Sequence, residues 1–481
     1  MLAQQPKLQL STYFDLYDLI VPKDNLLRRI NELVDFTFIY DELVSKYCTS
    51  NGRTAESPIR MFKYLLLKTI FDISDVDVVE RSRFDMSFKY FLGMTPEEGV
   101  IDPSSLTKFR KLRLKDADLL NLLISKTVTI ALEKGIIKSN SIIVDATHTG
   151  SRSNPLSAIE VLKERAKQLR KTVYSVDEGW VDRMPKKNED DDLIHELSYC
   201  SELEKEIVSD QLLCSLPKVK EKLNSLKETI EDVQDHYTLS KDPDARTGHK
   251  TQDSSFFGYK THLAMTEERI ITAAVVTSGE KGDGPELPEL LELSQKNGIQ
   301  VETIIGDAAY SGKDNLKMAK EQDIQIVAKL NPATQGFRKE DDAFEFNKDA
   351  GMFVCPAGHM ATRKARQGKK GAGTNQTFTY YFDVEKCRTC SLRNGCYKQD
   401  AKSKSYSVSI KSEEHKEQME FQQTDFFKDR ARHRYKIEAK NSELKNVHGY
   451  QRAKSYGIES MQMQGAMAIF TVNIKRILKL I

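Results

Sequence analysis

The sequence predicts a mixed α/β protein with an all-helical N-terminal region. Apolar residues recur at helical spacing throughout residues 25–135, where no strand pattern intervenes. Beyond them, short β-branched runs end in a carboxylate at Asp145 and again at Asp307, as expected of buried strands that deliver a side chain to a sheet edge. Strand and helix patterns alternate from 256 to 330, which is typical of a sheet covered by helices.

Length and composition indicate a globular protein of several units with balanced charge. The chain has 481 residues, enough for roughly two to four domains. Its 73 Lys and Arg residues nearly balance its 71 Asp and Glu residues, so the net charge of +2 does not by itself indicate a nucleic-acid partner. No apolar run reaches the roughly 20 residues that span a bilayer, and the first residues lack a secretory signal. We therefore expect a cytoplasmic protein without membrane contact.

Changes of pattern divide the chain into several parts. We expect a helical N-terminal domain over 1–135 and an α/β core formed by 140–334 together with 406–481. Charged, helix-forming sequence at 156–240 predicts a helical insertion in that core. Residues 335–405 are rich in glycine and basic residues and contain cysteines, which predicts a second insertion or small subdomain.

Three carboxylates are candidates for chemistry. Cleavage of a phosphodiester needs hard cations bound by oxygen ligands, and converging carboxylates can hold them. Asp145 and Asp307 follow predicted strands, although aspartates at strand ends are also typical of caps and turns. Arg434, Glu438 and Lys445 share one face of a C-terminal helix, where the carboxylate can bind metal while the cations grip phosphate. A surface ion pair between Arg434 and Glu438 is the alternative.

The spacing on this helix resembles that of a known enzyme family. Three residues separate Arg434 from Glu438, and six separate Glu438 from Lys445. This spacing matches the tyrosine-arginine-glutamate-lysine signature of DDE transposases from bacterial insertion sequences. Further segments resemble the family in its own order and span most of the chain: DPSSLTKFR (102–110), IIVDATH (142–148), DPDARTGHK (242–250), FGYKTH (257–262) and IIGDAAYSG (304–312).

The resemblance implies a ribonuclease-H-like catalytic core in which Asp145, Asp307 and Glu438 hold two Mg²⁺ (or Mn²⁺) ions, while Arg434 and Lys445 steady the phosphates. It also implies an enzyme that binds double-stranded DNA at the terminal inverted repeats of its element. Such an enzyme acts as a homodimer, cuts with water as nucleophile and joins the exposed 3′ hydroxyl to target DNA. The alternatives are a nuclease or resolvase of the same fold, or an inactive derivative that only binds DNA.

One position departs from the signature of the family. The tyrosine of the signature falls at Ala431, and Tyr435 lies elsewhere on the helix. This departure concerns the DNA contact that the family assigns to the tyrosine, and not metal binding. It is the one feature that favours an inactive derivative.

Local basic clusters indicate where DNA binds. Residues 428–454 carry nine Lys and Arg against three Asp and Glu, although a solvated helix face explains the outer lysines equally well. Five further cations are candidate DNA contacts: Lys108, Arg110, Arg113, Arg246 and Lys250. The first three lie where the chain resembles the family's helical DNA-end-binding domain. The last two precede the FGYKTH segment, where phosphate binding is favoured over an exposed loop.

The second insertion contains four of the seven cysteines. Cys355, Cys387, Cys390 and Cys396 supply four thiols, and His359 follows the first of them by four residues. One structural Zn²⁺ bound by these thiols, or by three of them and His359, would tie the insertion together. Free thiols in a reducing cytosol are the alternative, because a single CxxC is common by chance.

Overall fold

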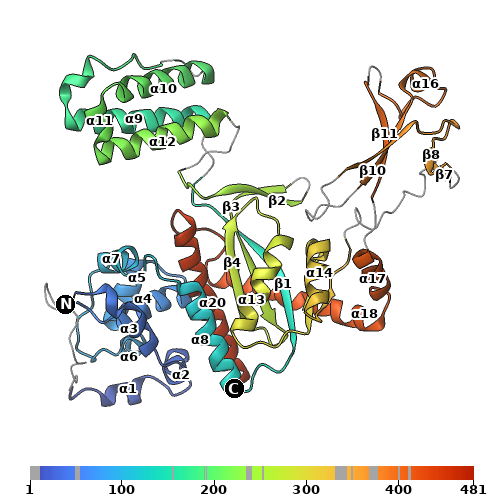
Figure 1. Ribbon diagram of the computed structural model, residues 1–481. Helices are drawn as coiled ribbons and strands as arrows, with labels where there is room; N and C mark the ends of the chain where they lie inside the picture. The colour runs from blue at the N-terminus through green and yellow to red at the C-terminus, as the bar shows by residue number, and fades with distance from the viewer. Residues whose placement is uncertain are drawn as a thin grey trace.

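The computed structural model arranges helices around one central mixed sheet (Figure 1). The structure describes residues 11–48, 55–153, 157–188, 190, 192–234, 241–251, 254–330, 344–347, 350–367, 377–398, 401–409 and 413–481. In this part of the chain, no helix combines the length and the apolar character needed to cross a membrane.

The described part of the N-terminal region folds into helices, as its apolar spacing predicts. They are α1 (Asp15–Ile20), α2 (Leu26–Leu33), α3 (Thr37–Leu43), η1 (Val44–Lys46), α4 (Pro58–Phe71), α5 (Asp75–Phe84), α6 (Met86–Leu92), α7 (Ser104–Leu112) and α8 (Leu119–Glu133). Side chains fix several of their first turns: Asn25 caps α2, and Ser74 and Asp77 form a capping box on α5. Leu106 and Phe109 are buried, so α7 turns its apolar face inward.

A six-stranded mixed sheet lies at the centre of the molecule. Its strands are β1 (Ser141–Gly150), β2 (Arg246–Thr251), β3 (Ser254–Thr266), β4 (Ile271–Ser278), β5 (Thr303–Ile305) and β6 (Gln325–Val327). The middle strand, β1, is antiparallel to β3 on one side and parallel to β5 on the other. β3 pairs with β2 and β4 along its other edge, so the order across the widest part is β4-β3-β1-β5-β6.

Two long helices join the sheet to the N-terminal helices. α8 and α20 (Ile458–Leu480) pack against each other and against β4, and α20 also contacts α4 (Figure 1). Phe62 of α4 and Phe470 of α20 meet edge to face, with ring centroids 6.1 Å apart. The buried apolar residues of both regions form one continuous cluster that runs from Leu27 to Leu478. The N-terminal helices and the sheet therefore share a hydrophobic core.

A buried polar side chain fastens α20 to the sheet. Asn473 is fully buried and donates hydrogen bonds to the hydroxyl of Thr127 on α8 at 2.9 Å and to the carbonyl of Ile271 at 2.8 Å. It also accepts a hydrogen bond from the backbone N–H of Ile271 at 2.9 Å. Because buried polar groups need hydrogen-bond partners, Asn473 fixes the relative position of α8, α20 and β4.

Two further parts of the chain have apolar clusters of their own. The first is a helical bundle of α9 (Ala158–Val176), η2 (Glu178–Val181), α10 (Leu193–Val208), α11 (Gln211–Ser215) and α12 (Pro217–Gln234). Trp180 packs inside this bundle and is only 3% exposed. The second contains β7 (Glu345–Asn347), β8 (Met352–Val354), β9 (Arg363–Gln367), β10 (Thr377–Phe382), α16 (Val384–Arg388) and β11 (Lys404–Ser409).

The remaining elements follow the strands of the central sheet or lie near the end of the chain. They are η3 (Gly284–Glu286), α13 (Leu287–Lys296), η4 (Ala308–Ser311), α14 (Lys313–Glu321), α17 (Glu413–Phe421), α18 (Asp425–Ala431), η5 (Arg432–Arg434) and α19 (Tyr435–Val447). α13 covers β3 and β4, and α19 packs against β1. The chain thus brings α19, nearly 300 residues later, back to the central strand.

Replacing Asn473 with Ala would leave the N–H of Ile271 and the hydroxyl of Thr127 buried without these partners. Since each buried group left unsatisfied costs about 1–3 kcal/mol, we expect Asn473→Ala to lower the free energy of unfolding by about 2–5 kcal/mol. Urea denaturation followed by circular dichroism measures the loss. Gln462→Ala, at an exposed position of the same helix, is the matched control and should change stability by less than about 0.5 kcal/mol. Equal stability of the two variants would contradict the fastening role.

Candidate active site

Asp145 and Asp307 lie next to each other because β1 and β5 are parallel neighbours. Ile143 of β1 pairs with Ile305 of β5, and each aspartate follows its paired residue by two positions. Asp307 therefore lies just past the carboxyl end of β5, beside Asp145 on the neighbouring strand. The expectation that a strand ends at Asp145 is wrong, because β1 continues to Gly150 along its antiparallel neighbour β3 and Asp145 lies in its middle. Asp307 also accepts a hydrogen bond from the N–H of Ala309 at 2.9 Å, which caps η4.

Helix α19 lays a polar face along β1. Asn441 donates a hydrogen bond from Nδ2 to Oδ2 of Asp145 at 3.0 Å. Four residues further on, Nζ of Lys445 lies 3.5 Å from Nε2 of His148 on β1. Glu438 precedes Asn441 by three residues on the same face. The helix therefore carries Glu438, Asn441 and Lys445 past the middle of β1, where Asp145 lies.

Arg434 links the aspartates to Glu438. The 3-10 turn η5 interrupts the C-terminal helix, so Arg434 ends this turn and Glu438 lies in the first turn of α19. The two side chains form an ion pair of 2.6 Å. Partial burial by itself would lower the pKa of Arg434, but the hydrogen bond to Glu438 and the charges of Asp145 and Asp307 raise it. One guanidinium thus interacts with all three carboxylates.

The local electrostatics disfavour a charged Asp145. Burial raises the pKa of Asp145 from its usual value of 3.8 to about 6. The guanidinium of Arg434 opposes this rise, whereas the charges of Asp307 and Asp283 add to it. A divalent cation would have the opposite effect, because a nearby positive charge favours the ionised carboxylate. Asp145 has the perturbed pKa expected of a functional acid.

The three carboxylates suit a hard cation by their chemistry, but they are not gathered around one point. Asp145, Asp307 and Glu438 offer oxygen ligands of the kind that Mg²⁺ prefers. Among the residues that the structure describes, no three Asp, Glu, His or Cys side chains lie close enough together to hold a metal ion. The ion pair with Arg434 holds Glu438, whose side chain is 55% exposed. Gathering the set around a cation requires Glu438 to leave Arg434.

Buried polar groups stand behind the aspartates. Tyr310 is fully buried, and its hydroxyl has no hydrogen-bond partner in the described structure. Burial, with the nearby charges of Asp283 and Asp145, raises the pKa of Tyr310 far above its usual range, so the hydroxyl keeps its proton. His262 of β3 is also fully buried, and burial lowers its pKa to about 4. Tyr310 and His262 are therefore both uncharged around pH 7.

The segments DPDARTGHK and FGYKTH contain a buried hydrogen-bond junction. Asp242 is fully buried and accepts hydrogen bonds from the hydroxyl of Tyr259, the hydroxyl of Ser151 at 2.8 Å and the N–H of Gly457 at 3.0 Å. At Gly258, a Cβ atom would lie 2.1 Å from the carbonyl oxygen of residue 149, so only glycine lets β3 approach β1 there. These residues hold β1, β3 and the start of α20 together.

The candidate DNA contacts of the N-terminal region differ in their surroundings. Lys108 is exposed on α7. Arg110 forms a two-pronged ion pair with Asp75 of α5. The guanidinium of Arg113 lies over the ring of Tyr47, 4.4 Å from its centroid. Two of these three cations therefore have partners within the N-terminal helices.

The other basic candidates are partly engaged as well. Arg246 donates hydrogen bonds to two backbone carbonyls of its own turn, and the side chain of Lys250 lies outside the described residues. In the basic cluster of 428–454, Arg430 and Lys436 both pair with Glu267 in the turn between β3 and β4. These two ion pairs fasten α18 and α19 to the sheet.

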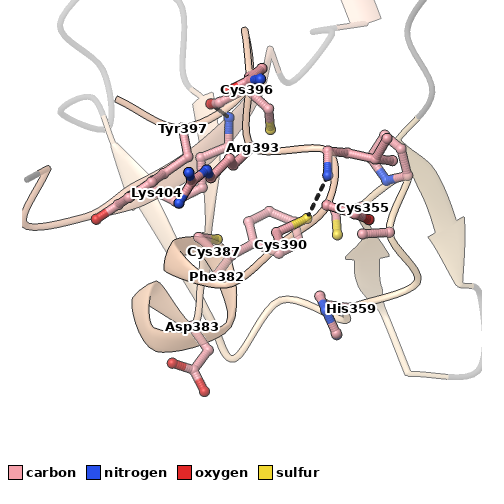
Figure 2. Close-up of a pocket in the computed structure, with 15 residues that line it drawn as sticks. Cys355, His359, Phe382, Asp383, Cys387, Cys390, Arg393, Cys396, Tyr397 and Lys404 are labelled. Carbon is pink, nitrogen blue, oxygen red and sulfur yellow. Dashed lines mark hydrogen bonds between the residues drawn. The ribbon is translucent and has the colours of Figure 1, made fainter. Parts of the chain in front are cut away.

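The four cysteines of the second insertion line one pocket of about 350 Å³ (Figure 2). Cys355 opens a turn that closes through a hydrogen bond from its N–H to the carbonyl of His359 at 2.8 Å. Cys387 lies in α16, Cys390 follows it, and both are free thiols, as are Cys355 and Cys396. Burial raises the pKa of Cys387, and the thiols of Cys355, Cys396 and Cys390 add to this rise. The four sulfurs are therefore close enough to interact electrostatically.

Asn441 and Tyr310 were not among the site residues predicted from the sequence. Asn441 lies three residues after Glu438 and four before Lys445, a spacing that places all three on one helical face. That signal is visible in the sequence. Tyr310 follows Asp307 by three residues, but its burial depends on the packing of the sheet, which the sequence does not reveal.

Two family models match the chain. The model described as Transposase domain (DUF772) matches residues 14–112, the helical N-terminal region. The model described as Transposase DDE domain matches residues 354–478, which include Glu438, the pocket with the four cysteines, and most of α20. No curated protein matches the chain.

The two matches agree with each other and with the fold. A DDE domain implies a ribonuclease-H-like core, and the described sheet, with β1 between an antiparallel and a parallel neighbour, is mixed as such a core requires. Enzymes with this domain use divalent metal ions for phosphodiester chemistry on DNA. The chain is therefore a DDE transposase of the insertion-sequence kind, a metal-dependent enzyme that cuts DNA and transfers its strands.

Proposed function

We propose that this transposase binds the terminal inverted repeats of its own element and that Asp145, Asp307 and Glu438 form its catalytic triad, with Mg²⁺ as the metal. The proposal is carried by the register of β1 and β5, which sets Asp145 and Asp307 side by side where α19 passes with Glu438. Mg²⁺ is favoured because all three ligands are hard carboxylate oxygens, and Mn²⁺ shares this preference.

Arg434 couples DNA binding to completion of the triad. A guanidinium binds phosphate with the same two-pronged geometry that it offers to a carboxylate. When a DNA phosphate replaces Glu438 as the partner of Arg434, the side chain of Glu438 is therefore released toward Asp145 and Asp307. Two divalent cations held there would activate the attacking oxygen and neutralise the leaving oxygen. Lys445 supplies a second positive charge, further along α19, for the DNA backbone.

We further propose that the enzyme acts as a homodimer, because two inverted repeats are related by a two-fold axis that two identical subunits can match. Residues 1–135 form the DNA-end-binding domain, with Lys108 as its most exposed candidate contact. Residues 156–240 and 335–405 are insertions in the core, and the separate apolar cluster of each supports this division.

Ala431 raises a second candidate, a derivative that binds DNA without cutting it. Ala431 is partly buried against the core, and no phenol is present where the signature of the tyrosine-bearing branch has one. Element-end DNA incubated with Mg²⁺ and a target plasmid distinguishes the candidates. Joined products support transposition, cleavage without joining supports a nuclease or resolvase, and binding alone supports the inactive derivative.

The four cysteines are proposed to hold one structural Zn²⁺. Four thiols around one pocket, two of them in a CxxC pair that begins inside α16, form the donor set of a closed zinc site. Binding requires the sulfurs to draw together, since no three of the described ligands are yet within metal-binding reach. His359 lines the same pocket and is the alternative fourth ligand.

Glu438→Gln should retain binding to element-end DNA and lose cleavage by at least about a hundredfold, because the amide keeps the shape of the side chain but lacks the charge that holds the metal. Gel-shift and cleavage assays on one preparation measure both properties. Glu420→Gln, on the exposed face of α17, is the matched control and should behave as wild type. Cleavage by Glu438→Gln at the wild-type rate would remove Glu438 from the mechanism.

Asp145→Asn should stabilise the metal-free protein above pH 6. The pKa of Asp145 is raised in the folded state, to about 6 from 3.8, so ionisation of the native carboxyl costs stability as pH rises through about 6. At about 1.4 kcal/mol per pKa unit, the gain is on the order of 3 kcal/mol at neutral pH and shrinks to zero as pH falls from 6 to 4. Thermal denaturation in EDTA across this range measures it.

The control for this change is Asp182→Asn, which removes the same charge at an exposed position of the helical bundle. It should show no pH-dependent gain between pH 4 and pH 8. A pH-independent effect of Asp145→Asn would contradict a raised pKa of the native carboxyl.

The protein expressed with zinc in the medium should contain one zinc ion per chain by metal analysis, since four thiolates bind Zn²⁺ tightly. Cys387→Ser and Cys390→Ser should each lose most of it. Cys48→Ser, an exposed cysteine far along the chain from the pocket, is the control and should keep it. Wild-type protein without zinc would contradict the proposal.

A further inference from the structure

A basic groove lined by Lys445 lies near the end of β1. It has a volume of about 750 Å³ and forms where the loop after α19 passes the end of β1 and the end of α4. Four cations line it, Arg152, Lys445, Arg452 and Lys454, against the single carboxylate of Asp72. We call it the α19-loop groove. Neither family match nor signature motif assigns these arginines a role.

The two arginines keep their charge uncompensated. Arg152 donates a hydrogen bond to the carbonyl of Lys454 at 3.3 Å, and Arg452 donates one to the carbonyl of Arg152 at 3.1 Å. Within the described residues, neither guanidinium forms an ion pair with a carboxylate, and both side chains are exposed. Asp72 instead pairs with Lys454 at 2.6 Å. A guanidinium has five N–H donors, so each arginine retains several for an anion.

Hydrogen bonds hold the floor of the groove in place. The backbone of Gly150 exchanges hydrogen bonds with the loop: its N–H donates to Gln451 at 3.0 Å and its carbonyl accepts from Ala453 at 2.8 Å. Gln464 of α20 donates to two carbonyls of the loop and accepts from the N–H of Lys454. A Cβ on Gly449 would lie 2.4 Å from Oδ1 of Asp72, so the loop and α4 are in close contact. The backbone that carries these cations is therefore held in place, which lowers the entropy cost of binding.

The groove lies in line with the candidate active site. The loop that lines the groove bonds to Gly150 and to Arg152, which follow Asp145 by five and seven residues. Because a strand rises about 3.3 Å per residue, the groove lies about 17–23 Å from the aspartate along β1, with its centre about 20 Å away. Lys445 lines the groove and also approaches His148, which lies between Asp145 and Arg152 along β1. One DNA strand advances about 3.4 Å per nucleotide, so 20 Å corresponds to about six nucleotides.

We propose that the α19-loop groove binds the phosphate backbone of one DNA strand about six nucleotides from the phosphate that is cut, with Arg152 and Arg452 as the principal contacts. This inference rests on the proposed function, because the triad marks where the cut phosphate lies. The contact fixes the register of the duplex at the site without reading its sequence. Arg152 and Arg452 are binding residues and touch no reacting atom.

The first test measures the salt dependence of DNA binding. A duplex that carries an end of the element, taken from the DNA that flanks the gene, is titrated in Ca²⁺ so that binding is observed without cleavage. Arg152→Gln/Arg452→Gln should bind about ten- to a hundredfold more weakly near 0.1 M salt, and its log–log salt slope should be shallower by about two. Lys218→Gln/Lys220→Gln removes the same charge from exposed positions on the helical bundle and should match wild type.

The second test locates the contact. Single neutral methylphosphonates are placed along the strand, and the binding of each duplex is compared between wild type and the double variant. Wild type should lose affinity at a position about six nucleotides from the cut, and the double variant should not lose affinity further there. Equal salt slopes, or equal losses in both proteins at that position, would overturn the proposal. Thermal denaturation of the double variant verifies that it is folded.

The outcome is separable from that of the proposed function. Both tests measure binding in Ca²⁺, so they remain informative if the wild-type protein fails to cut or to join DNA. Conversely, a Glu438→Gln protein that binds but does not cut leaves the groove untouched, because Arg152 and Arg452 lie outside the triad. Loss of cleavage with an unchanged salt slope in the double variant counts against the groove alone.

Discussion

The parallel pairing of β1 with β5 is the constraint on which the candidate site depends. Because Ile143 faces Ile305 in the register, any strand slip by one residue would separate Asp145 from Asp307 and turn one of them to the opposite face of the sheet. The register is held from outside the site. β3 pairs with β1 over nine consecutive positions, and the close approach at Gly258 together with the buried Asp242 fixes their far ends.

Within the described residues of the site, Arg434 balances several like charges. Two adjacent carboxylates in a partly buried place repel each other. The positive charge of Arg434 offsets this repulsion, because its guanidinium interacts with Asp145, Asp307 and Glu438 at once. Arg434 is thus an internal counter-ion for the site. A metal ion would compete with Arg434 for its carboxylate partners, whereas a DNA phosphate would compete with those carboxylates for the guanidinium. Tyr310 and His262 add no charge of their own. The α19-loop groove extends the same positive field along the DNA path.

Much of the fold could be predicted from the sequence, because local patterns carry it. The β-branched runs before Asp145 and Asp307 are strands, and Leu106 and Phe109 face inward from a short helix. Contacts between distant residues could not be predicted. Arg110 meets Asp75 of another helix, and Asp242 gathers donors from three separate stretches of chain, so neither partner set leaves a trace in local spacing. The 3-10 turn at 432–434 was also missed, since a helical pattern continues across it.

Helix α20 has a consequence for how DNA recognition and chemistry are coordinated. Its apolar face packs on α4, and its Asn473 is hydrogen-bonded to Ile271, the first residue of β4. Its Gln464 holds the loop that forms the floor of the basic groove. One helix therefore joins the N-terminal helices, the central sheet and the α19-loop groove. Motion of one of these parts relative to another would require a continuous core to slide past itself, so under the proposed function the DNA end and the cutting site are presented together as one preset unit.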